Sequence, residues 1–153
     1  MKTFLVIGAS SGIGNSIARQ LASSGHQVIG TYNNTDSTDQ SNIQFHKLDV
    51  NSYDNTEFIG EKLDGLVYCP GSINLMPFHR IKPEQFLADF NLQVLGAIKM
   101  IQASLPSLKK SKASSIVLFS TVAVQKGFNF HTQVSVSKGA IEGLTRALAA
   151  ELS

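Results

Sequence analysis

A glycine-rich stretch near the start of the chain constrains the fold more than any other feature. Its sequence is Gly-Ala-Ser-Ser-Gly-Ile-Gly at residues 8–14. It follows an apolar run at residues 4–7 and precedes a segment whose apolar residues recur at helical spacing. Between a strand and a helix, glycines let the backbone approach a phosphate, and the helix directs its free N–H groups at that anion. The stretch therefore predicts a pyrophosphate-binding turn. The alternative is a tight turn that binds nothing.

Strand-like and helix-like segments alternate along the rest of the chain. Apolar or alternating runs predict strands at residues 4–7, 27–32, 43–48, 63–69 and 115–120. Helical spacing and caps predict helices from the glycine turn to about 24, from 51 to 62, from 83 to about 112 with a break, and from 132 to 152. This alternation predicts an α/β fold with a Rossmann-type, doubly wound parallel sheet, whose five strands lie in the order 3-2-1-4-5.

The length of 153 residues suits one domain, so we expect residues 1–153 to form a single dinucleotide-binding domain. The complete fold has a sixth parallel strand, and the chain ends while its last predicted helix continues. We therefore expect the C-terminal part of the fold to be missing from this sequence.

Composition and charge exclude several classes of protein. The net charge is +2, with both signs scattered, which indicates neither a nucleic-acid nor a membrane partner. A single cysteine, Cys69, excludes an internal disulfide, and no stretch has the length of a transmembrane span. By default we expect a cytoplasmic protein, and we assign no metal site.

Several motifs resemble those of the short-chain dehydrogenase/reductase family. Residues 8–14 are similar to the family's Gly-x-x-x-Gly-x-Gly cofactor motif. Asn91 resembles the active-site asparagine, and Lys138 resembles the lysine of the Tyr-x-x-x-Lys motif. Ser120 and Thr121 end the fifth predicted strand, where the family has its catalytic serine. The resemblance covers essentially the whole chain.

The resemblance implies an NAD(P)-dependent oxidoreductase that reduces a carbonyl or oxidises an alcohol. It also implies a homodimer or homotetramer formed through the helices at 83–112 and 132–152. Asn91, Lys138, and Thr121 or Ser120 would act on the substrate. The cofactor contacts that we predict are Gly8, Ser10, Ser11, Gly12, Ile13, Gly14, Asn33, Asp49, Val50, Gly71 and Lys138.

One departure from the family pattern bears directly on catalysis. Val134 stands four residues before Lys138, where the family has its catalytic tyrosine. Valine cannot transfer a proton, so another group must do so. The candidates are the imidazole of His131, Thr121, or a water held by Lys138 and Asn91. The alternatives are a catalytically silent dinucleotide-binding sensor or scaffold, and a subunit that serves mainly in assembly.

Each of these residues also has a purely structural interpretation. Asp49 and His131 can cap helices, Thr121 can be a β-branched strand end, Asn91 can interrupt a helix, and Lys138 can be solvated. Cofactor choice is indicated only by the end of the second strand. No acid stands there before Asp36 to bind a ribose 2′-hydroxyl, which slightly favours NADP(H) over NAD(H).

Overall fold

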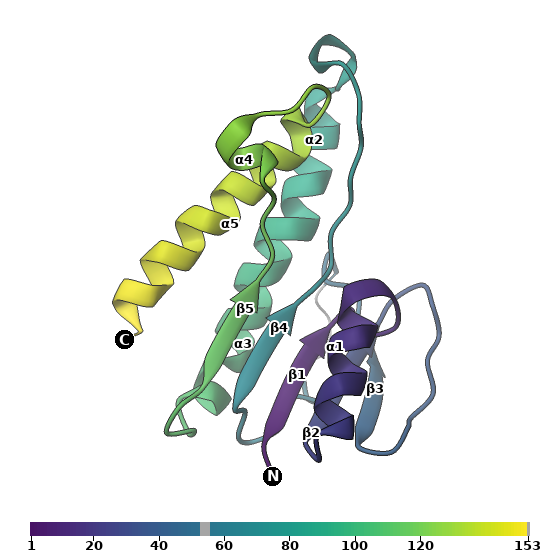
Figure 1. Ribbon diagram of the computed structural model, residues 1–153, viewed down its shortest axis with the longest axis vertical. Helices are drawn as coiled ribbons and strands as arrows, with labels where there is room; N and C mark the ends of the chain where they lie inside the picture. The colour runs from purple at the N-terminus through teal and green to yellow at the C-terminus, as the bar shows by residue number, and fades with distance from the viewer. Residues whose placement is uncertain (53–55, 153) are drawn as a thin grey trace. The chain divides into compact units, whose positions relative to one another are not determined.

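The computed structural model describes residues 1–52 and 56–152 and contains one five-stranded sheet. Its strand order is β3-β2-β1-β4-β5, with parallel pairing between β3 and β2, β2 and β1, and β1 and β4. The strands, seen in Figure 1, are β1 (Thr3–Ile7), β2 (Gln27–Tyr32), β3 (Ile43–Lys47), β4 (Gly65–Tyr68) and β5 (Ser115–Leu118). The predicted α/β class and the 3-2-1-4-5 order are confirmed.

Helices connect these strands as the alternation predicts. They are α1 (Gly12–Ser23), the short 3₁₀ helix η1 (Phe78–Arg80), α2 (Pro83–Phe90), the π-helix η2 (Asn91–Leu95), α3 (Gly96–Leu108), α4 (Ala123–Lys126) and α5 (Thr132–Glu151). The predicted break in the helix at 83–112 is the π-helical turn. The prediction of a helix at 51–62 is wrong for residues 56–62, which form turns and bends. There the Ile59 N–H already donates to the Thr56 carbonyl across a tight turn. Residues 53–55 lie outside the described residues.

The chain forms two compact units. Unit 1 comprises residues 1–69 and 98–117, and unit 2 comprises residues 70–97 and 118–153. The expectation of a single domain stays a prediction.

Apolar side chains of the central strand β1 fill the core of unit 1. Leu5, Val6 and Ile7 are completely buried, as is Leu66 on the neighbouring strand β4. Met100, from α3, is completely buried as well. A continuous apolar run is what a strand needs when both faces of a parallel sheet are covered. Burial of each such side chain contributes about 1.5–3 kcal/mol, so β1 fixes the position of the turn that follows it.

Helices α2, η2, α4 and α5 pack together in unit 2. Val94 and Ile141 supply buried apolar contacts, but this unit also buries polar side chains. The buried polar residues of unit 2 are Asp89, Gln93, Gln133 and Ser137. Among the residues that the structure describes, no helix combines the length and the apolar character that crossing a bilayer requires.

Candidate functional site

The glycine turn adopts a conformation that glycine permits and other residues resist. Gly8 and Gly12 have φ angles of 77° and 53°, in the left-handed region. The turn is anchored to the end of β2, because the Gly8 N–H donates to Thr31 Oγ1 at 3.0 Å and the Ala9 N–H donates to the Thr31 carbonyl at 2.7 Å. It is anchored to α1 because Asn15 Nδ2 donates to the Ala9 carbonyl at 3.1 Å. Unit 1 therefore holds this turn in one shape.

The geometry of the turn fits a pyrophosphate. A Cβ on Gly14 would overlap the Gly8 carbonyl, so only glycine lets α1 begin this close to the turn. A Cβ on Gly12 would meet no atom within 4 Å, which leaves open space beside the backbone. Ser11 precedes the helix with extended backbone and no side-chain cap, and the first turn of α1 carries no acidic residue. The N–H groups of Gly12, Ile13 and Gly14 are thus available to an anion.

The other predicted cofactor contacts in unit 1 differ in how far they are exposed and in which of their groups are free to bind a ligand. Ser10 is partly buried in the turn, and Asn33 is exposed immediately after β2. Asp49 accepts a hydrogen bond from the Asn51 N–H at 2.9 Å, so its carboxylate already stabilises a local turn. Val50 is buried and can offer a ligand only its backbone. Their roles as cofactor contacts stay predictions.

A buried carboxylate organises the polar interior of unit 2. Asp89 Oδ2 accepts a hydrogen bond from Ser137 Oγ at 2.6 Å. Asp89 Oδ1 accepts two more, from Ser72 Oγ and from Gln93 Nε2, both at 2.8 Å. Gln93 Nε2 also donates to the Ser72 carbonyl at 3.2 Å. These bonds join the segment after β4, the π-helix and α5 through one side chain.

Gln93 presents an unsatisfied oxygen at the point where two predicted site residues meet. Because both acceptors lie at Nε2, the amide orientation is fixed and Oε1 faces the other way. Oε1 is buried and has no hydrogen-bond partner. A Cβ on Gly71 would lie 3.3 Å from this oxygen and 3.8 Å from Lys138 Nζ. The structure therefore brings Gly71, Lys138 and Gln93 together, and the roles of Gly71 and Lys138 as cofactor contacts stay predictions.

The sequence analysis nominated Asn91 and passed over Gln93, two residues later; the catalytic role of Asn91 stays a prediction. The Asn91 side chain is only partly buried, and no hydrogen bond from it is seen within the described residues. Its carbonyl accepts the Gly96 N–H, which closes the π-helical turn. Residues two apart do not share a helix face, so Asn91 does not accompany Gln93 toward Gly71. A polar glutamine between the apolar Leu92 and Val94 was the available signal.

The two candidate hydroxyl groups after β5, those of Ser120 and Thr121, differ in the hydrogen bonds that they make within the protein. Ser120 Oγ donates to Glu142 Oε1 at 2.7 Å, so its proton is engaged. Thr121 Oγ1 accepts the Ala123 N–H at 3.3 Å, at the start of α4. Acceptance leaves the Thr121 hydroxyl proton available as a donor. Of the two, Thr121 is better suited to polarise a substrate oxygen.

His131 stands immediately before α5, one turn ahead of the buried Val134. Its Nδ1 lies 2.7 Å from the Asn129 carbonyl, and its ring packs edge-on against Phe128 at a centroid distance of 5.5 Å. A carbonyl can only accept, so Nδ1 carries a proton, and in the neutral ring Nε2 is then the acceptor nitrogen. The neutral His131 ring thus offers a proton-accepting atom one helical turn before Val134, where the tyrosine is missing.

Tyr68, at the end of β4, is a buried tyrosine. Burial raises the pKa of its phenol far above the usual value, because the anion would be desolvated. A phenol with a raised pKa gives up its proton reluctantly near neutral pH.

Comparison with known proteins places the whole chain in one family. The family model described as "short chain dehydrogenase" matches residues 2–153. The chain belongs to the short chain dehydrogenase family. Family members are NAD(P)-dependent oxidoreductases, which agrees with the glycine turn in unit 1.

Individual relatives support this membership and show its extent. An acetoacetyl-CoA reductase from Shinella zoogloeoides is 30% identical, over 96% of this chain and 66% of the relative. A 3-ketodihydrosphingosine reductase from Bacteroides thetaiotaomicron is 25% identical, over 97% of this chain and 57% of the relative. The solved structure of a short-chain dehydrogenase from Streptomyces avermitilis matches with a TM-score of 0.87 and 29% identity, over 99% of this chain and 60% of that one. This short chain dehydrogenase sequence therefore spans about three-fifths of the length of such relatives.

Proposed function

We propose that the chain binds NAD(P)(H) at the glycine turn and belongs to an oxidoreductase that reduces a carbonyl or oxidises an alcohol. The observation that carries this proposal is the turn itself, whose open Gly12 and uncapped helix start admit a pyrophosphate. The names of two relatives, an acetoacetyl-CoA reductase and a 3-ketodihydrosphingosine reductase, support a ketone substrate. When bound, the nicotinamide supplies or accepts the hydride.

Lys138 and Gln93 would hold a hydroxyl group beside Gly71. An ammonium can only donate and an amide oxygen can only accept, so the pair suits a group that does both. A ribose hydroxyl, a substrate hydroxyl or a water meets that requirement. The unsatisfied Gln93 Oε1 supports the assignment, because a buried acceptor without a partner costs about 1–3 kcal/mol until a ligand donates to it.

Proton transfer would rely on groups near Val134. His131 Nε2 would accept the proton of an alcohol, or return one to a ketone oxygen, while the Thr121 hydroxyl donates to the same oxygen. A water held by Lys138 and Asn91 is the alternative carrier. A protein that binds the cofactor and does not turn over is the alternative function, and Val134 is the residue that favours it.

The finer assignments are part of the same proposal. NADP(H) is preferred over NAD(H), because the exposed Asn33 and its neighbours place no acid before Asp36 to repel a 2′-phosphate. A second copy packs on the helices of residues 83–112 and 132–152, where Leu87 and Val136 are more than half exposed. A cytoplasmic location is supported by the single cysteine.

Calorimetric titration with NADPH and NADH tests cofactor binding directly. Turnover of 3-ketoacyl thioesters is measured as the decrease in NADPH absorbance. We expect NADPH to bind more tightly than NADH. Replacement of Lys138 by methionine removes the ammonium and should weaken NADPH binding about tenfold. The matched variant Lys110→Met removes an exposed lysine of unit 1 and should change nothing. Failure to bind either cofactor would overturn the proposal, and tight binding without turnover would favour the silent alternative.

A further inference from the structure

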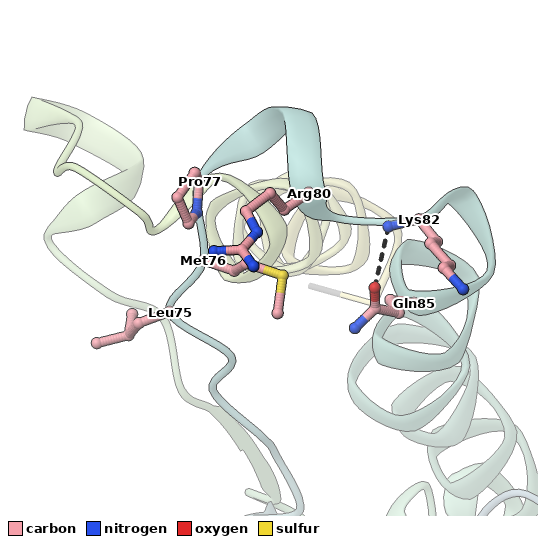
Figure 2. A pocket seen from close by; sticks show the side chains of 6 residues that line it. All are labelled: Leu75, Met76, Pro77, Arg80, Lys82 and Gln85. Atoms are coloured by element: carbon pink, nitrogen blue, oxygen red, sulfur yellow. Dashed lines mark hydrogen bonds between the residues drawn. The ribbon is translucent and has the colours of Figure 1, made fainter.

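Unit 2 contains a pocket that the proposed chemistry does not use. Its volume is about 710 Å³, and it is lined by Leu75, Met76, Pro77, Arg80, Lys82 and Gln85. Figure 2 shows that the first three side chains come from the loop before η1, whereas Lys82 and Gln85 stand at the start of α2. This volume is in the range of small-molecule sites, which are mostly apolar with a few polar groups.

The pocket has a distinct electrostatic character. Two of its six lining residues are cationic and none is acidic. Among the described residues, neither Arg80 nor Lys82 forms an ion pair, whereas Lys62 and Arg146 each lie within 4 Å of a carboxylate. Unpaired cations beside an apolar wall suit a ligand that is apolar along its length and carries an anionic group.

Hydrogen bonds hold the pocket walls to the segment that carries the candidate active-site residues. The Met76 N–H donates to the Phe130 carbonyl at 3.3 Å, immediately before His131. Gln133, immediately before Val134, accepts from Asn74 Nδ2 at 3.1 Å and donates to the Gln85 carbonyl at 2.8 Å. The start of α5 is therefore bonded to both walls.

Two hydrogen bonds stabilise the wall of the pocket that the start of α2 forms. Gln85 Oε1 accepts the Lys82 N–H at 2.9 Å, drawn as the dashed line in Figure 2. The Gln85 N–H donates back to the Lys82 carbonyl at 3.0 Å. These reciprocal bonds fix the start of α2, so Lys82 emerges from a defined backbone position.

The chain sets an upper limit on the distance between this pocket and the Lys138 amine. Four residues lie between Gly71, which faces Lys138 Nζ, and Met76 in the pocket wall, so the two Cα atoms are five steps apart along the chain. A fully extended segment of that length spans at most about 17 Å. An acyl chain of moderate length can therefore reach from one place to the other.

We propose that this pocket binds the far end of the substrate, an apolar chain that bears a carboxylate or a phosphate. Arg80 pairs with the anion, Lys82 attracts it, and Leu75, Met76 and Pro77 contact the chain. The assignment rests on the proposed oxidoreductase function, because it makes the pocket the specificity site for that reaction.

Direct binding tests this inference without any turnover. The full chain is titrated by calorimetry with octanoate, octyl phosphate and the neutral octanol. We expect both anions to bind more tightly than octanol, because only they pair with Arg80. The tighter of the two identifies the anionic group, carboxylate or phosphate. Equal affinity for octanol, or no binding of either anion, would overturn the proposal.

Substitution of Arg80 locates the site. Arg80→Gln removes the charge and keeps the length of the side chain, and it should weaken octanoate or octyl phosphate binding about tenfold. Lys110→Gln, at an exposed lysine outside the pocket, is the matched control and should have no effect. Unchanged affinity in Arg80→Gln would place the anion elsewhere and refute the assignment. Cofactor binding and ligand binding in the pocket are measured in separate titrations. Failure of the pocket inference can therefore be distinguished from failure of the oxidoreductase proposal.

Discussion

Val134 replaces a proton-donating phenol with an isopropyl group at a buried position of α5. Its side chain is only 6% exposed, and Ser137 and Lys138 follow within about one turn. Ser137 is held by the Asp89 carboxylate, so the backbone that carries Lys138 is well fixed. The framework for Tyr–Lys chemistry is therefore in place around a residue that cannot perform it.

Restoration of the phenol is the sharpest test at this position. In Val134→Tyr we expect carbonyl reduction to rise about 10²-fold, because a general acid would again lie beside Lys138. The larger side chain must fit a buried site, which costs about 1–3 kcal/mol of stability. Turnover and thermal unfolding are measured together. Val134→Phe, which adds the same ring without the hydroxyl group, serves as the control. A folded, cofactor-binding Val134→Tyr protein without increased turnover would show that the geometry around Lys138 is unsuited to a tyrosine.

Lys138 could be nominated from a short local motif and Gly71 from its place after a predicted strand, and their roles in the site stay predictions. Gln93 escaped prediction because its position depends on the π-helix. A π-helical turn adds a residue and rotates every later side chain relative to the earlier ones. Helical spacing read from the sequence assumes a regular turn, so it cannot tell which of Asn91 and Gln93 faces Gly71. The unpaired Oε1 atom is visible only once the bonds of Asp89 are known.

Helix α1 begins as close to the glycine turn as a polypeptide permits. Gly14 packs against the Gly8 carbonyl, and that approach directs the first N–H groups of α1 into the open space beside Gly12. The close approach of α1 to the turn after β1 therefore requires that residue 14 carry no Cβ. Apart from the helix expected at 51–62, the positions of the strands and long helices were predictable from periodicity, whereas strand ends shifted by one or two residues. For example, β5 ends at Leu118, before the predicted residue 120.

Two glycines in helix interiors should respond oppositely to the same substitution. Gly14→Ala places a methyl group onto the Gly8 carbonyl, so we expect α1 to shift and NADPH affinity to fall at least tenfold. Gly143→Ala, in α5, meets no atom within 4 Å and should stabilise the protein by about 0.5–1 kcal/mol. Urea unfolding and cofactor titration are compared for the pair. Normal cofactor affinity in Gly14→Ala would contradict the close-packing argument.

Asp64 connects three distant parts of unit 1. Its carboxylate accepts the Thr3 N–H at the start of β1 at 2.9 Å and Ser111 Oγ, beyond the end of α3, at 2.7 Å. The Ser111 hydrogen bond, and then the Thr3 N–H, hold the pKa of Asp64 below its ordinary value. This carboxylate therefore stabilises the fold in its ionised form.

The stability that Asp64 contributes should depend on pH in a defined direction. The folded pKa lies below the unfolded value of about 3.9, so the contribution is complete above that pH and is lost as the pH falls through the folded pKa. We expect Ser111→Ala to reduce the free energy of unfolding by about 1 kcal/mol at pH near 7. The difference from the parent protein should shrink in strong acid. Urea unfolding at both pH values measures it, with the exposed Ser114→Ala as control. An equal difference at both pH values would assign the loss to packing.

The two units interleave along the chain. Residues 1–69 and 98–117 make one unit, and the stretches that follow each of them make the other. During synthesis, β1, β2 and β3 can pair early, but Met100 and β5 join the first unit only after residues 70–97 have left the ribosome. A nick anywhere in 70–97 would leave neither fragment with a complete first unit. The two pieces would therefore have to remain associated to remain folded, and no single cut can release either unit as an independent protein.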